Sequence, residues 1–300
     1  MYQYVLCGLR VESDLAFPEL TPWEGPSEAP VELEFRLGAV EPLQDPDDHR
    51  SRFEVRGPHC ITFLIRGVGR VSIEDGRRVV FDALAEVAPL ALRTNFVGII
   101  QAVVWHQRGY LPLHGSTVLV GGCGIAVAGP SESGKSVTAA ALTKRGYPLV
   151  ADDFTVIDWR PERPLVFPAY QKLRLQKDAC DQFGLLNAAV AEAHPSREKY
   201  VLETDAIPSG AAVPICDIFI LAGERGRAFS AEKLGAVQGV QNLLSSVHML
   251  EAANALGLQR QVFDAVNAIA AKVQLWRITV PDGLDRAGET AESIAALVSH

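Results

Sequence analysis

The sequence has little basic charge and lacks any closely spaced pair of cysteines. Its 300 residues contain 28 Lys and Arg against 36 Asp and Glu, a formal net charge of −8. Non-specific nucleic-acid binding needs a basic surface that neutralises phosphates, so this balance argues against nucleic acid as a partner. No C-x-x-C pair occurs, which excludes the usual zinc and thioredoxin-like motifs. We therefore expect free, mostly buried thiols in a reducing cytoplasm at all five cysteines, which are Cys7, Cys60, Cys123, Cys180 and Cys216.

Long hydrophobic runs are also missing. The N-terminus has no basic segment followed by an apolar stretch, so no secretory signal is predicted. The longest run without Asp, Glu, Lys or Arg, from Gly109 to Ser131, is broken by Pro112, His114 and further glycines, which makes it a poor membrane-spanning helix. Apolar residues still make up 48% of the chain, enough to bury a core. We expect a cytoplasmic globular protein without a membrane partner.

The length and the residue pattern predict two domains. At about 150 residues per domain, the chain has room for two. Residues 1–92 contain short strand-like runs and a hairpin signal at Asp75-Gly76, which predicts a small β-rich N-terminal domain. Residues 93–300 alternate strands with helices and predict an α/β catalytic domain. Its expected elements are a helical connector at 93–106, a parallel βαβ unit at 124–129, 136–146 and 147–159, helices at 231–246, 249–256, 260–272 and 285–298, and strands at 215–223 and 273–280.

A phosphate-binding motif lies at the turn between the first strand and helix of this βαβ unit. Residues 129–136 match G-x-x-x-x-G-K-[ST] at every fixed position. Glycines let the backbone wrap around a phosphate with its N–H groups inward, and the N-terminus of the following helix attracts anions. Lys135 can reach the β- and γ-phosphates, and the Ser136 hydroxyl can ligate Mg²⁺. The candidate nucleotide-binding residues are Gly129, Ser131, Glu132, Ser133, Gly134, Lys135, Ser136 and Val137.

Two carboxylates, Asp152 and Asp153, end the strand V-A-D-D that follows the helix. In an open parallel sheet, this position is expected to lie beside the phosphate loop, where ligands collect. One carboxylate would hold the metal ion and the other would accept a proton from a hydroxyl nucleophile. By itself an acidic pair is equally typical of a solvated turn, and the neighbouring phosphate loop favours the functional interpretation.

Several classes of phosphate-loop protein are excluded by missing motifs. The sequence has no L-S-G-G-Q of ABC transporters, no N-K-x-D of GTPases, and no H-R-D or D-F-G of protein kinases. An ATPase, a nucleotide-dependent switch and a kinase remain. The acidic pair favours phosphoryl transfer to a hydroxyl.

The stretch LPLHGSTVLVGGCGIAVAGPSESGKSVTAAALTKRGYPLVADD, residues 111–153, resembles the core of the HPr kinase/phosphorylase family. It has the L-H-G segment, the hairpin, the G-x-S-x-x-G-K-S loop, the helix that ends in R-G and the D-D strand of that family. The resemblance implies a phosphate-loop catalytic domain of the HPr kinase/PEP carboxykinase type, with ATP and Mg²⁺ as cofactors.

The same resemblance implies roles for individual residues. Lys135 would bind the nucleotide phosphates, while Ser136 and Asp153 would serve the metal ion. Asp152 would be the general base, and His114 would be its neighbour in the active site. A homo-oligomeric assembly is left open.

The chain departs from that family after residue 160. The E-I-R-G-x-G signature is absent from residues 160–230, where VFPAYQKLRLQKDACDQFG (166–184) and SREKY (196–200) stand instead. These segments resemble shorter HPr-kinase-related proteins, including kinases that phosphorylate the C-terminal serine of lasso-peptide precursors. Four cations are then candidates for binding phosphate or a peptide carboxylate, although each one alone is equally typical of a solvated surface: Lys172, Arg174, Arg197 and Lys199.

The sequence thus favours an ATP- and Mg²⁺-dependent serine kinase that acts on a peptide or small protein, with a lasso-peptide precursor as one substrate to consider. A non-catalytic nucleotide-binding regulator is the alternative from another class. An HPr-type carrier-protein kinase and a small-molecule kinase also remain open. The motifs do not name the acceptor.

Overall fold

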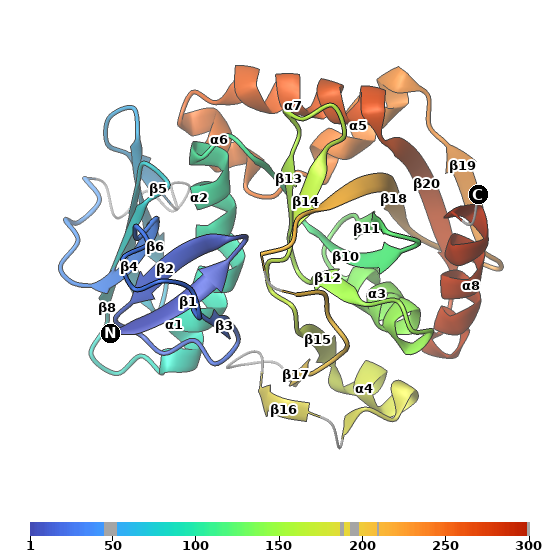
Figure 1. Ribbon diagram of the computed structural model, residues 1–300, viewed down its shortest axis with the longest axis horizontal. Coiled ribbons are helices and arrows are strands. Elements are labelled where there is room, and N and C mark those ends of the chain that lie inside the picture. The colour runs from blue at the N-terminus through green and yellow to red at the C-terminus, as the bar shows by residue number, and fades with distance from the viewer. Residues whose placement is uncertain (45–52, 187–188, 193–197, 209, 299–300) are drawn as a thin grey trace.

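A computed structural model describes residues 1–44, 53–186, 189–192, 198–208 and 210–298. Within these residues, eight strands form one sheet, nine form a second and three form a small third sheet. Figure 1 shows the first sheet at the left and the second at the right, with α2 (Gln101–Gln107) between them. The β-rich N-terminal part and the α/β remainder expected from the sequence are both present.

The N-terminal sheet is mostly antiparallel, in the order β3-β1-β2-β4-β8-β7-β6-β5. Its hairpin turn at Asp75-Gly76 has left-handed backbone at both positions, with φ of 53° and 61°, as the sequence predicts for a primed turn. The strands of this sheet are β1 (Tyr2–Leu6), β2 (Leu9–Ser13), β3 (Thr21–Pro22), β4 (Leu33–Leu37), β5 (Phe53–Val55), β6 (Cys60–Ile65), β7 (Gly69–Glu74) and β8 (Arg78–Ala83).

A continuous helical segment joins the two sheets and supplies part of the first core. It runs through α1 (Pro89–Asn95), the π-helical turn η1 (Phe96–Ile100) and α2, somewhat longer than the predicted connector. Phe96 is fully buried, and its ring lies 4.7 Å from that of Phe17 and 5.0 Å from that of Phe35. The core of the N-terminal sheet therefore depends on this helical segment.

The second sheet is centred on the long strand β18 (Val213–Gly226), which pairs with β11 and β20 in parallel and with β14 antiparallel. Its path is β12-β10-β11-β18-β14-β13-β9, with β20 and β19 branching from β18. The remaining strands are β9 (Leu111–Leu113), β10 (Gly115–Val120), β11 (Cys123–Ala128), β12 (Leu149–Ala151), β13 (Thr155–Asp158), β14 (Leu165–Phe167), β19 (Ser230–Lys233) and β20 (Gln274–Pro281).

The predicted βαβ unit needs a correction. The strand expected at 147–159 is two strands, β12 and β13, interrupted at Asp152 and Asp153, where Asp153 has a φ of 72°. β12 does not pair with β11, because β10 lies between them and is antiparallel to both. The hairpin strand β10 therefore occupies the position that the sequence analysis gave to β12.

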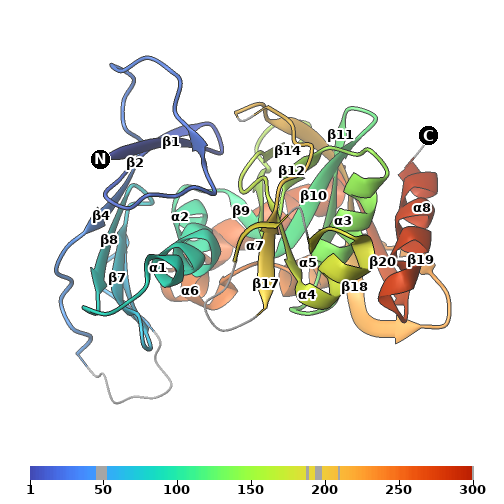
Figure 2. The same ribbon diagram turned by 90° about the horizontal axis from the view of Figure 1, so that it is seen from below.

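Helices cover both faces of the second sheet. Ile125 and Val127 of β11 are buried with α3 and α8 on one face, whereas Ala126 and Ala128 are buried with α5 and α7 on the other. This burial on both faces explains the continuous apolar run of the strand. The helices around this sheet are α3 (Lys135–Lys144), α5 (Ala236–Ser245), α6 (Leu250–Ala255), α7 (Gln259–Lys272), η3 (Leu284–Arg286) and α8 (Ala287–Val298). Figure 2, seen from below, shows α8 and α3 beside each other.

The third sheet and a short helix lie near the phosphate loop. The sheet consists of β15 (Leu173–Gln176), β17 (Lys199–Leu202) and β16 (Ala189–Glu192), and α4 (Lys177–Phe183) follows β15. The helix expected at 231–246 begins only at Ala236, because the residues before it form β19 on the edge of the second sheet. No helix in the described part of the chain is long and apolar enough to cross a membrane.

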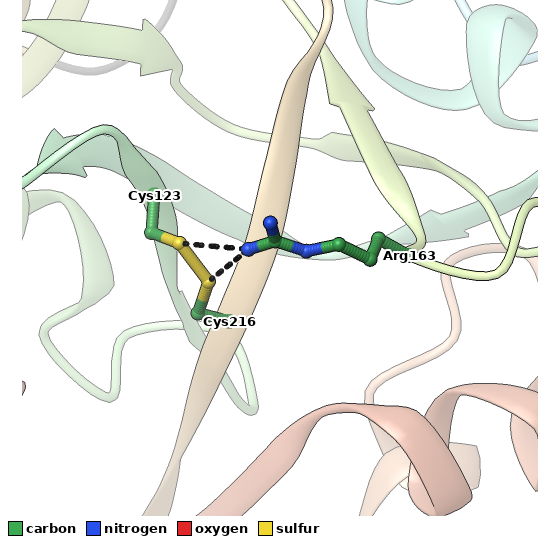
Figure 3. Close-up of a disulfide and its surroundings, with 3 residues drawn as sticks. All are labelled: Cys123, Arg163 and Cys216. Carbon is green, nitrogen blue, oxygen red and sulfur yellow. Dashed lines mark hydrogen bonds between the residues drawn. A yellow bond between two sulfur atoms is a disulfide. The ribbon is translucent and has the colours of Figure 1, made fainter.

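The expectation of free thiols is wrong for two of the five cysteines. Cys123, at the start of β11, and Cys216, in β18, form a disulfide with their Cα atoms 5.8 Å apart. Their strands are hydrogen-bonded neighbours, which brings together residues that the sequence separates by 93 positions. Figure 3 shows Arg163 directed at both sulfur atoms, 3.8 and 3.9 Å away. Cys7, Cys60 and Cys180 are free.

We expect thiol titration of the unfolded chain to find three reactive cysteines before reduction and five after it. Replacing both Cys123 and Cys216 by serine should lower the unfolding free energy by about 3 kcal/mol, because the cross-link restricts the unfolded chain. Denaturant unfolding measures this change, with Cys60→Ser as the control. Five reactive thiols without reductant would contradict the pairing.

Candidate functional site

Residues 129–136, which carry the predicted phosphate-loop motif, form the turn from β11 to α3. Gly129 and Gly134 have φ values of 145° and 104°, a region that side chains disfavour. A Cβ atom on Gly129 would also lie 3.0 Å from the Cβ of Leu221. Lys135 begins α3, and its Nζ donates a hydrogen bond to the carbonyl of Pro130, 2.6 Å away. The Lys135 ammonium group is therefore bonded to its own loop at the N-terminus of α3, a position that favours the binding of anions.

A cavity of about 480 Å³ opens over this loop and collects most of the predicted residues. Those that line it are Ser131, Glu132, Gly134, Lys135, Ser136, Val137, His114, Asp153, Arg174 and Lys199. Arg225 of β18, which the sequence analysis did not select, also lines it. Its guanidinium lies against Gly134, 3.0 Å from the position of a Cβ atom there. The cavity thus joins a phosphate loop to a carboxylate and several cations.

Four of the predicted residues are not among those that line the cavity: Gly129, Ser133, Asp152 and Lys172. Lys172 instead donates a hydrogen bond to the carbonyl of Pro18, at 3.3 Å, and pairs with Glu203, at 3.5 Å. The Lys172 ammonium group therefore bonds to groups that do not line the cavity. Arg197 lies outside the described residues.

Asp152 is fully buried and is surrounded by donors. Its Oδ1 accepts hydrogen bonds from the hydroxyls of Ser116, at 2.6 Å, and Ser136, at 3.1 Å. Its Oδ2 accepts the backbone N–H of Arg174 at 2.8 Å. A buried carboxylate needs such partners. Asp152 is therefore positioned to hold the Ser136 hydroxyl from behind the phosphate loop.

Asp153 points the other way, into the cavity, and its side chain is 21% exposed. It forms an ion pair with the Arg174 guanidinium. Burial raises the pKa of Asp153, but Arg174 and then Lys199 and His114 lower it by more, so the net shift is downward. The carboxylate is therefore ionised at neutral pH and faces the cavity.

Lys135 is largely buried, and its environment weakens its hold on its proton. Burial lowers the pKa of Lys135 to about 8, and Lys199 adds to this effect while Asp153 and Asp152 oppose it. A phosphate group placed in the loop would favour the charged ammonium.

Three histidines lie close together at the cavity, two of them stacked, and the sequence pointed to only His114. The rings of His114 and His248 are stacked, with centroids 5.1 Å apart. His248 reaches this place because its backbone N–H bonds to the carbonyl of Pro112 at 2.9 Å. The fully buried His106 lies 2.7 Å from the His248 carbonyl through Nε2, so that nitrogen carries a proton. No local motif marks His248, because only tertiary pairing brings it to His114.

The stacked histidines are neutral at physiological pH. Burial lowers the pKa of His114 to about 4, and Lys135 and His248 add to the effect. Burial likewise lowers the pKa of His106 to about 4. Neutral rings are able to line the site without repelling Lys135.

We expect acid to destabilise the fold through His106. Its pKa of about 4 in the folded protein lies below the ordinary 6.5 of an unfolded chain, so the unfolded state binds the proton first. The contribution of neutral His106 to the unfolding free energy is complete above pH 6.5. It decreases by about 3 kcal/mol as the pH falls to 4. Urea unfolding across this range measures the loss, and in His106→Gln, which cannot titrate, it should be smaller. Equal losses in both proteins would contradict the assignment.

Comparison with known proteins gives short but definite similarities. No protein-family model matches the chain. Over 62 residues it is 44% identical to an HPr kinase/phosphorylase of Limosilactobacillus reuteri, which covers 21% of this chain and 19% of that protein. Over 57 residues it is 46% identical to an HPr kinase/phosphorylase of Chlorobium phaeobacteroides, which covers 19% and 17%. The chain spans about a fifth of the length of the curated relatives it matches.

A solved structure of an HPr(Ser) kinase/phosphatase from Coxiella burnetii shares 14% identity, over 62% of this chain and 87% of that one, with a TM-score of 0.29. A score this low supports no argument about this fold. The sequence comparison alone therefore supports a relationship: over about one fifth of its length, this chain is similar to HPr kinase/phosphorylases.

Proposed function

We propose that the protein is an ATP- and Mg²⁺-dependent kinase that phosphorylates a serine of a peptide or small protein. The observation that best supports this proposal is that one cavity is lined by the ionised Asp153, by the phosphate loop and by Lys135. A loop alone suits any nucleotide-binding protein, whereas a carboxylate across the cavity suits proton removal from a hydroxyl. The similarity to HPr kinase/phosphorylases supports the same reaction class.

The phosphate loop would hold the nucleotide. Backbone N–H groups of the loop and the N-terminus of α3 would bind the phosphates, and Lys135 would leave the Pro130 carbonyl to bind the β- and γ-phosphates. The donor set suits Mg²⁺, which takes few protein ligands besides phosphates and water. Ser136 would hold it through its hydroxyl, with Asp152 bonded to that hydroxyl. The ion, when bound, would neutralise the charge that develops on the phosphates.

The geometry favours exchanging the two carboxylate roles that the family resemblance implies. Asp152 is enclosed by three donors and bonded to Ser136, which suits the metal side of the site. Asp153 faces the cavity and suits the general base. In the proposed step, the serine oxygen attacks the γ-phosphorus, its proton passes to Asp153, and the bond from the γ-phosphorus to the β,γ-bridging oxygen breaks to release ADP.

The acceptor would be recognised by cations at the cavity. Lys199 and Arg174 both line it. We assign these two cations to a carboxylate or phosphate of the acceptor, as in a peptide that ends in serine, of which a lasso-peptide precursor is one example. Lys172 is less suited, because it is turned toward Pro18.

We expect transfer from labelled ATP to an acceptor peptide, seen by mass spectrometry as one phosphate on serine. Lys135→Ala should reduce the rate by roughly 10²-fold or more, because it removes the cation that stabilises the transferred group. Lys144→Ala, at the exposed end of the same helix, is the matched control. The acceptors are a peptide ending in serine, the same peptide extended beyond it, and HPr. Tight ATP binding with no transfer to any of them would favour the non-catalytic regulator.

Asparagine substitutions at the two aspartates should change different kinetic parameters. Asp153→Asn should lower kcat by roughly 10²-fold while the KM for ATP changes little, because it removes only the proton acceptor. Asp152→Asn should mainly raise the Mg²⁺ concentration needed for half-maximal rate. Steady-state rates at varied ATP and Mg²⁺ test both. The reversed pattern would restore Asp152 as the base, and two active variants would make both carboxylates structural.

A further inference from the structure

A small gap lies between the N-terminal sheet and the back of the candidate site. Glu19, which lies between β2 and β3, and Arg93, in α1, face it from one side. Tyr170 and Arg174 face it from the other side. Its volume is about 10 Å³, measured as the space open to the centre of a water molecule, which is about what one buried water requires.

Two polar atoms at this gap lack a hydrogen-bond partner among the described residues. They are Oε2 of Glu19 and Nε of Arg174, and both are buried. The other oxygen of Glu19 accepts a hydrogen bond from Arg93 Nε at 2.8 Å. Buried polar groups are rarely left without a partner, so each of the two atoms calls for an explanation.

The chemistry of the two atoms is complementary. A carboxylate oxygen only accepts hydrogen bonds, and a guanidinium Nε–H only donates. A single water is able to accept from Arg174 and donate to Glu19, which satisfies both atoms. No apolar or ionic occupant of that volume would do this.

We propose that a buried water links Glu19 to Arg174 and makes Glu19 a positioning residue of the site. Arg174 is only 7% exposed, its Nη2 pairs with Asp153, and its guanidinium lies 5.3 Å from the ring centre of Tyr170. Fixing Nε as well prevents rotation of the guanidinium and holds Nη2 toward Asp153. The N-terminal sheet thereby sets the orientation of the carboxylate that faces the acceptor.

Other contacts support a fixed junction at this place. The backbone N–H of Cys7 donates to the carbonyl of Pro168 at 3.1 Å, and Lys172 reaches the carbonyl of Pro18, next to Glu19. These bonds join the N-terminal sheet to the segment that leads into β15. Glu19 is therefore held in place at the back of the site.

The water is tested without reference to activity. In Glu19→Gln, the amide oxygen still accepts from Arg93, but an NH₂ replaces the accepting Oε2, so the water loses its acceptor. We expect the Arg174 Nε–H in ¹⁵N NMR, identified by its loss in Arg174→Lys, to exchange slowly with solvent in the wild type and at least about tenfold faster in Glu19→Gln. Glu24→Gln, on the exposed loop nearby, is the control. Equal exchange in wild type and Glu19→Gln would overturn the link.

The positioning role of Glu19 rests on the proposed function and is measured separately, by enzyme kinetics. Glu19→Gln should lower kcat by about tenfold while the KM for ATP stays unchanged, because only the acceptor side of the cavity is disturbed. A variant with the faster Nε–H exchange but wild-type kcat would overturn the positioning role alone. If Glu19→Gln does not fold, a crystal structure of the wild type decides, since an empty gap there would overturn the water. An inactive wild type with the slow Nε–H would instead overturn the proposed function and leave the water standing.

Discussion

Three donors from three elements meet at the buried carboxylate of Asp152, and much of the site geometry follows from that meeting. Ser116 comes from β10, Ser136 from the first turn of α3, and the backbone N–H of Arg174 from β15. A fully buried carboxylate is tolerated only with such partners, so the three elements are held at fixed distances from one another. Because Arg174 also pairs with Asp153 through its side chain, one residue ties both carboxylates to the third sheet.

The cavity is richer in basic groups than the chain as a whole. Lys135, Lys199, Arg174 and Arg225 line it together with three carboxylates, Glu132, Asp153 and Asp178, whereas the whole chain carries a net charge of −8. An acidic protein does not attract anions from a distance, and exposed charges are screened beyond about 8 to 10 Å. Binding of an anionic ligand must therefore depend on contacts inside the cavity, where burial strengthens each of them.

The N-terminal sheet is part of the structure that supports the site. Phe154, the residue after the acidic pair, and Tyr170 are buried in the same hydrophobic cluster as Phe17 and Phe35 of the N-terminal part. The helical segment from Pro89 to Gln107 packs into that cluster and leads directly into β9. The first sheet therefore shares one hydrophobic core with the segments that flank the two aspartates.

The sequence by itself determined the glycine-rich turn at residues 129–134 and the start of α3, because eight consecutive residues of the phosphate-loop motif specify this backbone. It also predicted that Asp152 and Asp153 lie near that loop, because they end the strand that follows the helix after the loop. It did not determine which carboxylate faces the cavity, because that depends on the left-handed backbone at Asp153 and on Arg174. The stacking of His248 on His114 and the Cys123–Cys216 disulfide were likewise decided only by the tertiary structure. These contacts join segments far apart in the chain, and no local periodicity or spacing records which distant segments the packing of two sheets brings together.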